Sequence, residues 1–416
     1  MKRILCTIMV LVMAISLFAC NKSPDSEELA ELDTEVGISG ESGESQGEEK
    51  PSQKPSENPD QPTGNDEGEE QKPSEENKEE KDPAQSENKP SEEKEPSAET
   101  EQKPQQEKPK EEGKDKLSHL INDTSGTKLK ILCQNLRFNS QDEWGTDNFI
   151  GIRRYRFQAL MEKYDPDVVG LQECDKTWIE YLQQDYGREY TMFYQYRGSP
   201  TGSDEASPVM WKTDKYKMVD SGYFWLSDTP DVSSASFIKG AHPRIVTWVK
   251  LKDLASGQFF NVYSTHFGFY EEDAHINKIR NLIANSFRTA GEYSFIMGDF
   301  NIAYEDDQYW RLMQTNLLGD LRPVSEAMAK DGICELGDIR NGAYNAFSYP
   351  DGGVFGDYIM AKPHRNLAVD HFGYCYERPA VPEQNIGEGY VSDHFAVYAE
   401  VRMGTKQSYE KYWGVF

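Results

Sequence analysis

The stretch Phe295-Ile296-Met297-Gly298-Asp299-Phe300-Asn301 decides the fold of this 416-residue chain. Its first three residues form a continuous apolar run, which is typical of a buried strand. The run ends at a glycine, a carboxylate and an amide. Asp299 and Asn301 are separated by one aromatic residue, so a bending chain can point both side chains to the same side. We therefore expect a polar site at the end of this strand.

Four other segments place polar side chains beside apolar runs. They are Ile131-Leu132-Cys133-Gln134-Asn135, Val168-Val169-Gly170-Leu171-Gln172-Glu173, Val262-Tyr263-Ser264-Thr265-His266, and Ser392-Asp393-His394 with Asp357 upstream. Polar groups at strand ends converge where one sheet packs on another. A cluster of oxygen ligands with two histidines is what metal-assisted phosphoester hydrolysis requires. The pattern predicts a magnesium-dependent phosphoesterase.

Strand-like and helical patterns alternate through the C-terminal part of the chain. The expected strands are 129–135, 168–173, 190–196, 208–212, 217–225, 244–251, 259–266, 295–299, 354–361, 369–376 and 395–401; the expected helices are 153–164, 175–186, 273–289 and 306–317. Many strands with few crossover helices predict an α/β (α+β) fold, a two-layer mixed β-sandwich flanked by helices. We assign it to one domain, residues 116–416.

Residues 1–20 resemble an export signal. Met1-Lys2-Arg3 is followed by an apolar run that is too short for a stable membrane span, and the segment ends at Cys20. Leu17-Phe18-Ala19-Cys20 resembles the lipobox of bacterial lipoproteins, in which the cysteine carries the lipid. The prediction is an exported lipoprotein of the bacterial cell envelope, held on the outer membrane or cell surface through Cys20. An ordinary signal peptide is the alternative.

Residues 21–115 are rich in Glu, Lys, Pro, Ser, Gln and Gly, with almost no aromatic or branched apolar residues. Such a segment buries too little apolar surface to offset the entropy of ordering. We interpret it as a disordered acidic tether. An interaction tail for a basic partner is the alternative, and the lysines interspersed through the segment disfavour it.

The domain from residue 116 is acidic, with 31 Lys and Arg against 41 Asp and Glu. Proteins that bind nucleic acid through its backbone usually present a basic face, so the composition disfavours an extended polyanion. A local basic patch at Arg153-Arg154-Tyr155-Arg156 stays open. Its four cysteines, Cys133, Cys174, Cys334 and Cys375, show no Cys-x-x-Cys spacing. Buried free thiols are the favoured interpretation, and a disulfide between two of them is the alternative.

Residues 128–401 resemble the endonuclease/exonuclease/phosphatase superfamily. The segments that carry the resemblance are Gln134-Asn135-Leu136-Arg137, Gly170-Leu171-Gln172-Glu173, Pro208-Val209-Met210-Trp211-Lys212, Ser264-Thr265-His266, Gly298-Asp299-Phe300-Asn301, Gly356-Asp357-Tyr358-Ile359 and Ser392-Asp393-His394. A bacterial exported subgroup is similar through 224–230 and 243–248. The resemblance implies the sandwich fold and phosphoester hydrolysis by direct in-line attack of water.

The resemblance also implies a role for each site residue. Glu173 would be the main Mg²⁺ ligand, with Asn135 and Asp393 completing the shell directly or through water; Mn²⁺ is the alternative metal. Asp299 would orient or deprotonate the attacking water, and Asn301 would donate to a phosphoryl oxygen.

The remaining catalytic assignments concern the two histidines. His394 paired with Asp357, and His266, would flank the scissile phosphate as acid, base or charge stabiliser. Glu205 occupies the place of a carboxylate that pairs with the first histidine in the deoxyribonuclease branch. His242 and Arg137 are further candidates for contact with a substrate phosphate, whereas His119, His275, His364 and His371 show no ligand spacing.

One departure from the exported subgroup concerns substrate contacts. Many of its members continue Thr-His with Leu-Asp-His, but here His266 is followed by Phe267-Gly268-Phe269-Tyr270. These aromatic residues either fill the core, which we favour, or stack on a sugar or base.

The leading hypothesis is a hydrolase of phosphomonoesters or phosphodiesters outside the cytoplasm, with no obligate protein partner. An extracellular endonuclease on DNA or RNA is the second hypothesis. A surface binding protein that has lost catalysis is the third, and the joint presence of the site residues disfavours it.

Overall fold

The computed structural model describes residues 112–198, 204–234, 237, 241–269, 272–291, 293–354 and 356–414. The expected signal peptide and nearly all of the expected tether lie outside these residues. Helix α2 (Glu112–Ile121) begins within the last four residues of the expected tether, so regular structure starts slightly earlier than the composition indicates. Among the described residues, no helix combines the length and the apolar character needed to cross a bilayer.

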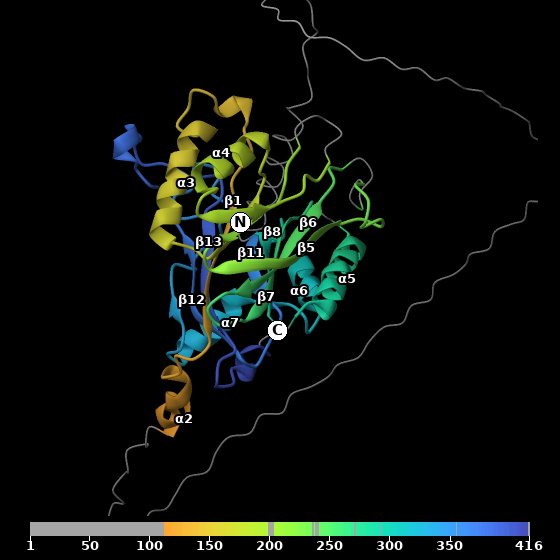
Figure 1. The fold of residues 1–416 in the computed structure, drawn as a ribbon, viewed down its shortest axis with the longest axis vertical. Helices are drawn as coiled ribbons and strands as arrows, with labels where there is room; N and C mark the ends of the chain where they lie inside the picture. The colour runs from red at the N-terminus through yellow and green to blue at the C-terminus, as the bar shows by residue number, and fades with distance from the viewer. Residues whose placement is uncertain are drawn as a thin grey trace, which may run out of the picture. The chain divides into compact units, whose positions relative to one another are not determined.

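Two mixed β-sheets form the centre of the domain (Figure 1). The seven-stranded sheet has the order β10-β12-β13-β1-β2-β4-β3. Its strands are β1 (Thr127–Asn135), β2 (Val168–Gln172), β3 (Tyr190–Phe193), β4 (Val209–Lys212), β10 (Glu335–Leu336), β12 (Leu367–Cys375) and β13 (Ala396–Met403). The six-stranded sheet has the order β5-β6-β7-β8-β11-β9. Its strands are β5 (Tyr216–Trp225), β6 (Ile245–Asp253), β7 (Phe259–His266), β8 (Ser294–Asp299), β9 (Gly319–Asp320) and β11 (Asp357–Ala361).

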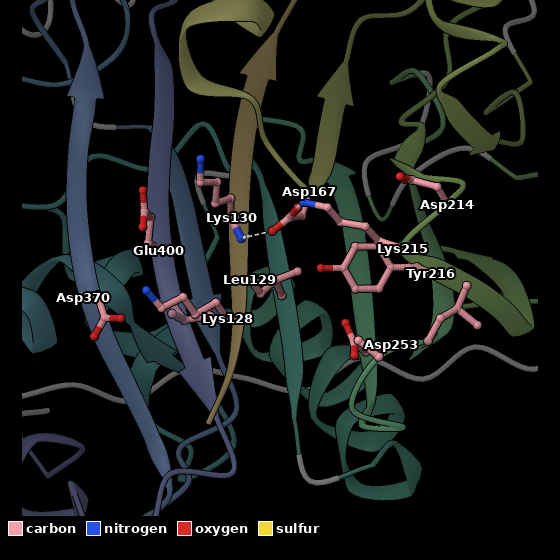
Figure 2. A pocket seen from close by; sticks show the side chains of 13 residues that line it. Lys128, Leu129, Lys130, Asp167, Asp214, Lys215, Tyr216, Asp253, Asp370 and Glu400 are labelled. Carbon is pink, nitrogen blue, oxygen red and sulfur yellow. Dashed lines mark hydrogen bonds and ion pairs between the residues drawn. The ribbon is translucent and has the colours of Figure 1, made fainter. Parts of the chain in front are cut away.

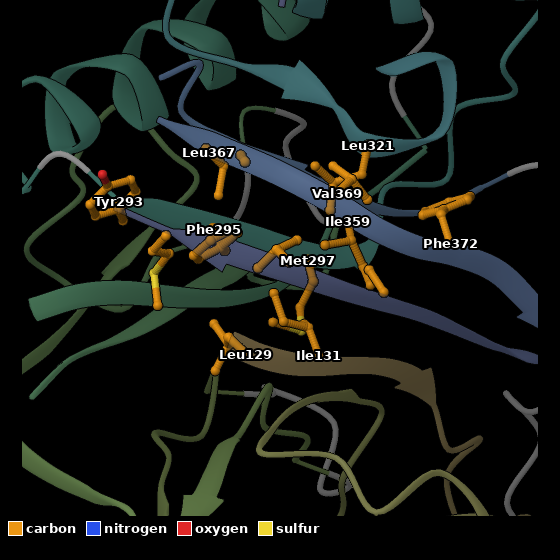
Figure 3. Packing of buried hydrophobic residues seen from close by; sticks show 14 of the residues in the cluster. Leu129, Ile131, Tyr293, Phe295, Met297, Leu321, Ile359, Leu367, Val369 and Phe372 are labelled. Atoms are coloured by element: carbon orange, nitrogen blue, oxygen red, sulfur yellow. The ribbon is translucent and has the colours of Figure 1, made fainter. Parts of the chain in front are cut away.

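The two sheets pack face to face through apolar side chains. Leu129 and Ile131 of β1 lie opposite Phe295 and Met297 of β8, and all four are fully buried (Figure 3). Both faces of these central strands are covered, which explains why they are continuous apolar runs in the sequence instead of alternating patterns. Burial of such side chains contributes roughly 1.5–3 kcal/mol each, so this interface stabilises the arrangement of the strand ends.

Helices cover the outer faces of both sheets (Figure 1). Helices α3 (Ile150–Tyr164) and α4 (Lys176–Tyr186) pack on the seven-stranded sheet through residues such as Phe157 and Trp178. Helices α5 (Asp273–Thr289) and α6 (Asp307–Met313) cover the six-stranded sheet through residues such as Ile279 and Leu312. The predicted two-layer α/β sandwich flanked by helices is confirmed.

Helix α7 (Leu321–Lys330) was not among the predicted helices. Its first turn contains Pro323, which interrupts a helical pattern in the sequence. Proline is tolerated there because the first N–H groups of a helix have no partner within it. The side chain of Asp320 caps the helix by accepting from Arg322 N at 2.9 Å. The two-residue strands β9 and β10, and the 3₁₀ turns at Gln141–Glu143, Pro382–Gln384 and Glu410–Tyr412, are too short to leave a periodic signal.

Two glycines let the central strands approach closely. A Cβ on Gly298 would lie 2.0 Å from the carbonyl oxygen of Thr265 on the neighbouring strand β7. A Cβ on Gly170 would lie 2.4 Å from Cγ of Met297 across the sandwich. Glycine is required at position 298 because the clash is with backbone, whereas a side chain at position 170 would displace the side chain of Met297. These approaches bring the ends of β2, β7 and β8 together.

Candidate active site

The predicted site residues gather at one end of the sandwich. Parallel pairing of β7 and β8 puts His266 beside Asp299, and antiparallel pairing of β11 and β8 puts Asp357 on the other side of Asp299. Strand β1 ends at Asn135, and Glu173 follows directly on β2. Strand pairing alone therefore joins residues that lie far apart in the sequence.

Asp299 lies at the centre of this cluster. Its Oδ2 accepts a hydrogen bond from Asn135 Nδ2 at 3.0 Å and lies 3.7 Å from Nε2 of both His266 and His394. The side chain is almost fully buried. Burial, and then the negative charge of Asp357, raise the pKa of Asp299 to about 7. A carboxylate with such a pKa can take up and release a proton near neutral pH.

His394 forms a buried pair with Asp357. Its Nδ1 lies 2.8 Å from Asp357 Oδ2, and its backbone carbonyl accepts from Gln134 Nε2 at 2.9 Å. Burial opposes a charge on the ring, but the carboxylates of Asp357 and Asp299 outweigh it and raise the pKa of His394 well above its usual range. His394 is therefore an imidazolium at neutral pH, with Nε2 directed toward Asp299.

His266 has the opposite charge state. Burial, followed by the nearby positive charges of Arg244 and Arg197, holds the pKa of His266 well below its usual range. Its Nε2 lies 3.0 Å from Asn301 Nδ2, and the second hydrogen of this amide is donated to Phe267 O at 2.9 Å. The neutral ring accepts through Nε2, so Nδ1 carries its proton. One neutral and one cationic imidazole thus flank the same carboxylate, which is an arrangement suited to acid–base chemistry.

Asn301 contacts His266 in this structure, and its expected donation to a phosphoryl oxygen stays a prediction. Both hydrogens of its amide nitrogen already have acceptors, on His266 and on the backbone of Phe267. In this structure the side chain orients His266.

The expected pair between Glu205 and His266 is not formed. Glu205 Oε1 instead accepts from Arg197 Nη2 at 2.6 Å, and Arg197 N donates to the backbone carbonyl of Glu205 at 2.9 Å. Nδ1 of His266 is buried and has no hydrogen-bond partner in the part of the chain that the structure describes. Glu205 prefers the guanidinium because a charged partner compensates its burial better than a neutral ring does. Burial nevertheless raises the pKa of Glu205.

The residues expected to hold a metal lie on the other side of Asp299. Glu173 Oε1 is 3.0 Å from Asn135 Nδ2, and Glu173 Oε2 accepts from Phe138 N at 3.2 Å. Asp393 Oδ2 lies 3.7 Å from Nη1 of Arg137. Burial lowers the pKa of Arg137, but Asp393, Glu173 and Glu143 outweigh this and raise it. The carboxylates of Glu173 and Asp393 therefore both act on the guanidinium of Arg137.

This donor set suits a hard divalent cation. Glu173, Asn135 and Asp393 offer carboxylate and amide oxygens, which Mg²⁺ and Mn²⁺ prefer, and they are few enough to leave room for water. Asp299, Asp357 and His394 also place three ligand atoms within 4.8 Å of one another. A metal ion that took His394 Nδ1 or Asp357 Oδ2 would break the 2.8 Å bond between them, whereas His394 Nε2 and Asp357 Oδ1 are outside that bond. The expected assignment of Glu173, Asn135 and Asp393 to the metal stays a prediction.

The family is established by a comparison of sequences. The model of the "Endonuclease/Exonuclease/phosphatase family" matches residues 136–394, which is more than half of the chain and includes every site residue named above except Asn135. The chain belongs to this family. Its members hydrolyse phosphoester bonds and are typically dependent on divalent metals. A search of curated proteins gave no match.

Solved structures show the same fold. A family protein from Bacteroides thetaiotaomicron is 24% identical with a TM-score of 0.58, and the match covers 67% of this chain and 99% of that one. A mannosyl-6-phosphatase from Bacteroides thetaiotaomicron VPI-5482 is 23% identical with a TM-score of 0.56, covering 66% and 99%. A protein from Enterococcus faecalis V583 is 21% identical with a TM-score of 0.54, covering 66% and 100%.

Three site residues adopt left-handed backbone conformations that are uncommon for side chains other than glycine. The φ angles are 56° at Arg137, 56° at Glu173 and 51° at Asn301. Two of them are stabilised locally, because Arg137 N donates to Asn135 Oδ1 and Asn301 N donates to Asp299 Oδ1, each at 2.9 Å. Strain of this kind is typical of functional sites in which a side chain must be aimed. Nothing in the sequence marks these positions, since none is glycine.

Arg153 is a supporting residue that the sequence did not reveal. It is fully buried, donates to the backbone carbonyls of Leu136, Arg137 and Phe138, and forms an ion pair with Glu143 at 3.1 Å. It thereby fixes the loop that follows Asn135. The patch at 153–156 is not a basic surface: Arg156 is also buried, and Arg154 forms an ion pair with Asp185.

Residues 343–345 also support the site without a sequence signal. The ring of Tyr344 packs edge-on against His394 with 5.1 Å between ring centroids. Asn345 is fully buried; its backbone N donates to Asp393 O at 2.7 Å, and its side chain donates to Ser392 O at 3.2 Å. This loop therefore holds the Ser392-Asp393-His394 segment in place.

The aromatic residues after His266 divide between the two expected roles. Phe267 is fully buried and stacks on Phe300 with 4.3 Å between ring centroids, so core packing is confirmed there. Phe269 is exposed and does not fill the core. Tyr270 lies outside the described residues. The four domain cysteines are free and buried, as favoured over a disulfide.

A cleft of about 610 Å³ lies at the opposite end of strand β1 (Figure 2). It is lined by three lysines and five acidic residues among others, and it contains none of the predicted site residues; the charged residues are Lys128, Lys130, Lys215, Asp167, Asp214, Asp253, Asp370 and Glu400. Lys215 Nζ lies 2.7 Å from Asp167 Oδ1, and Lys130 N donates to Asp167 Oδ2 at 2.9 Å. Lys215 and Asp167 thus pair with one another, and Asp370 pairs with Arg402 outside the lining at 2.8 Å.

Proposed function

We propose that this protein is a metal-dependent hydrolase of phosphoesters that uses direct in-line attack of water. The observation that carries the proposal is the buried Asp299, held between a neutral His266 and a cationic His394 at 3.7 Å from each. Membership of the family supports phosphoester hydrolysis as the reaction. No sulfur, hydroxyl or amine of the site has the neighbours that would activate it as a nucleophile, so a covalent intermediate is not part of the proposal.

The protein's own groups can carry the proton transfers. Asp299 accepts the proton of the attacking water, because its raised pKa makes it a stronger base than an ordinary aspartate. His394 is cationic, and its Nε2 can stabilise the developing charge or donate a proton to the leaving oxygen. Asp357 fixes the orientation of His394 through Nδ1. Asn301 fixes His266, whose ring borders the same space.

The metal is proposed to be Mg²⁺, with Mn²⁺ as the alternative, held by Glu173, Asn135 and Asp393. When bound, it would polarise the phosphoryl group as a Lewis acid. Its charge would also help Arg137 to offset the carboxylates of Glu173 and Asp393.

The proposed location is the bacterial cell envelope. Leu17-Phe18-Ala19-Cys20 supports export and lipidation of Cys20, and the following segment supports a flexible acidic tether. Incorporation of labelled palmitate into the wild-type chain but not into Cys20→Ser would support this proposal. Equal labelling of both chains, or of neither, would contradict it.

The function is tested by hydrolysis assays with the full chain and Mg²⁺. The substrates are p-nitrophenyl phosphate, bis-p-nitrophenyl phosphate, sphingomyelin and plasmid DNA. Turnover of a small or lipid phosphoester without DNA cleavage supports the proposal. DNA nicking at comparable efficiency would favour the endonuclease instead, and silence on every substrate, with metal binding intact, would favour a binding protein without catalysis.

A further inference from the structure

The backbone of Tyr344 lies directly against that of His394. An isolated antiparallel bridge pairs the two residues. Hydrogen bonds on both sides hold this bridge, because the carbonyl oxygen of the residue before Tyr344 accepts from Phe395 N at 2.8 Å and Asn345 N donates to Asp393 O at 2.7 Å. The position of Tyr344 relative to the catalytic histidine is therefore fixed by main-chain contacts.

This pairing directs the side chains of Tyr344 and His394 to the same side. Residues directly opposite one another on an antiparallel pair project from the same face, and their side chains lie closest where the pair exchanges no hydrogen bonds, as here. The two rings accordingly pack edge-on, with 5.1 Å between their centroids and 66° between their planes. Because His394 Nε2 lies 3.7 Å from Asp299 Oδ2, the phenol of Tyr344 borders the proposed reaction centre.

The charges that act on the phenol place it near the predicted metal ligands as well. Burial, and then the carboxylate of Asp393, raise the pKa of Tyr344 to about 12; Glu173 also raises it, and Arg137 lowers it. The phenol therefore keeps its proton at neutral pH, so it can donate a hydrogen bond but cannot act as a base. It lies near His394 and near the side of the site where a metal is expected.

The hydroxyl of Tyr344 forms no hydrogen bond with the described residues, and the side chain is partly exposed. Other tyrosines of the domain have acceptors within the protein. Tyr358 donates to Ile302 O at 2.7 Å, and Tyr309 donates to Asp320 Oδ2 at 2.8 Å. A tyrosine that only fills space usually finds such a partner when it packs against the core. The hydroxyl of Tyr344 is instead left available to a bound molecule.

We propose that Tyr344 is a substrate-binding residue of the phosphoesterase site, and that its hydroxyl donates a hydrogen bond to an oxygen of the phosphoryl group. The inference rests on the proposed function and adds a neutral donor beside the cationic His394. Tyr344 transfers no proton and forms no covalent bond. Phosphoryl oxygens carry negative charge throughout the reaction, and a donor that is already fixed in place stabilises this charge without reorganisation.

The variant Tyr344→Phe separates the hydroxyl from the ring. Phenylalanine keeps the edge-on contact with His394, and no hydrogen bond with the described residues is lost, so the variant should unfold at the wild-type temperature. Tyr412→Phe is the matched control, because it removes a hydroxyl that donates to Asp331 Oδ2 at 2.7 Å, at the end of α7 and outside the site. A ring that acts only through packing predicts wild-type activity in both variants.

The first measurement is kcat/KM with Mg²⁺ for the better of p-nitrophenyl phosphate and bis-p-nitrophenyl phosphate, with the full chain. Tyr344→Phe should lower kcat/KM by about 10–100-fold, the range expected when a hydrogen bond to a charged group is lost. Tyr412→Phe should keep the wild-type value. A wild-type kcat/KM in Tyr344→Phe would overturn the proposal.

The second measurement needs no turnover, so it separates this contact from the proposed function. Isothermal titration of the wild-type protein with sodium phosphate, in the presence of MgCl₂, should show saturable binding. The affinity should fall about tenfold in Tyr344→Phe and stay unchanged in Tyr412→Phe. If no substrate is hydrolysed, the proposed function fails and this titration alone decides the contact. No phosphate binding by the wild type, or equal affinity in Tyr344→Phe, would overturn the inference.

Discussion

The two ends of strand β1 carry similar numbers of charged groups but organise them differently. At the Asn135 end, polar side chains from five strands converge on Asp299 and are buried, with pKa values shifted by burial and by one another. At the Lys128 end, charged residues line an open cleft of about 610 Å³, and Lys215 forms an ion pair there with Asp167 (Figure 2).

The difference shows that a cavity lined by charged residues does not by itself indicate a reactive site, whereas the convergence of buried titratable groups does. Groups that must react are held in positions where their charges are costly, and this cost is the source of their shifted pKa values. Groups that only stabilise the fold find solvent or a partner. Changes at the first end should therefore alter activity and metal binding, and changes at the second end should alter only stability.

The largest expected difference between the two ends is in kcat, when His394→Gln is compared with Asp167→Asn. Loss of the cationic imidazole beside Asp299 should lower kcat by about 10²–10⁴-fold, the usual contribution of a positioned acid. Asp167→Asn should leave kcat unchanged, although it weakens the contacts with Lys215 and Lys130. Steady-state assays with the best phosphoester substrate would measure both. Similar losses of kcat in the two variants would contradict the assignment of catalysis to the Asn135 end of β1.

The second difference concerns stability without metal. The pKa of Asp299 is raised to about 7, so the folded protein binds this proton more tightly than the unfolded chain does. The resulting stabilisation is complete below about pH 4 and is lost as the pH rises through 7. At pH 8 in EDTA, Asp299→Asn should therefore be more stable than wild type, on the order of 2 kcal/mol, because the buried charge is removed.

Asp167→Asn is the matched comparison for that experiment. It should be less stable than wild type by about 1 kcal/mol at the same pH, because it loses an ion pair and removes no destabilising buried charge. Urea unfolding of the three proteins at pH 5 and pH 8 would measure both effects. Destabilisation by Asp299→Asn at pH 8 would show that this carboxylate is structural, as at the cleft.

A third difference is expected in metal binding. Glu173→Gln replaces a carboxylate by a neutral amide of the same shape and should weaken Mg²⁺ or Mn²⁺ binding at least tenfold. Glu400→Gln at the cleft should bind the metal as wild type does. Isothermal titration with MnCl₂ would compare the two variants. Weaker metal binding in Glu400→Gln alone would mean that the metal binds at the Lys128 end of β1 instead of the Asn135 end.

The smallest effect is expected for Lys215→Gln. Nearly half of this side chain is exposed, so its 2.7 Å ion pair with Asp167 is screened by solvent. The variant should lose about 0.5 kcal/mol of unfolding free energy, and less in 1 M NaCl. A loss of unfolding free energy that is several times larger and independent of salt would mean that solvent does not screen this ion pair.

The fold was largely predictable because it depends on local pattern. The buried strands are continuous apolar runs, and helices 153–164 and 273–289 were recognisable from their periodicity. Helix α7 was missed because Pro323 obscures its first turn. The positions of the strand ends were also predictable, since Asn135, Glu173, His266 and Asp299 each terminate such a run.

The interactions between those residues were less predictable. Pairing of Glu205 with Arg197 in place of His266 depends on which partner a loop brings within 2.6 Å, and sequence spacing does not encode this. The left-handed backbone at Glu173 and the support of Arg153 are likewise products of packing. Sequence therefore identified the members of the site, and the three-dimensional structure was needed to assign their partners and charge states.

The most direct test of the account is hydrolysis of p-nitrophenyl phosphate and bis-p-nitrophenyl phosphate by the wild-type chain and by Asp299→Asn, each with Mg²⁺ and with EDTA. The wild-type protein should turn over at least one substrate in a metal-dependent way, and Asp299→Asn should lose at least about 10²-fold in turnover while it stays folded. Turnover that persists in EDTA or in Asp299→Asn would contradict this expectation.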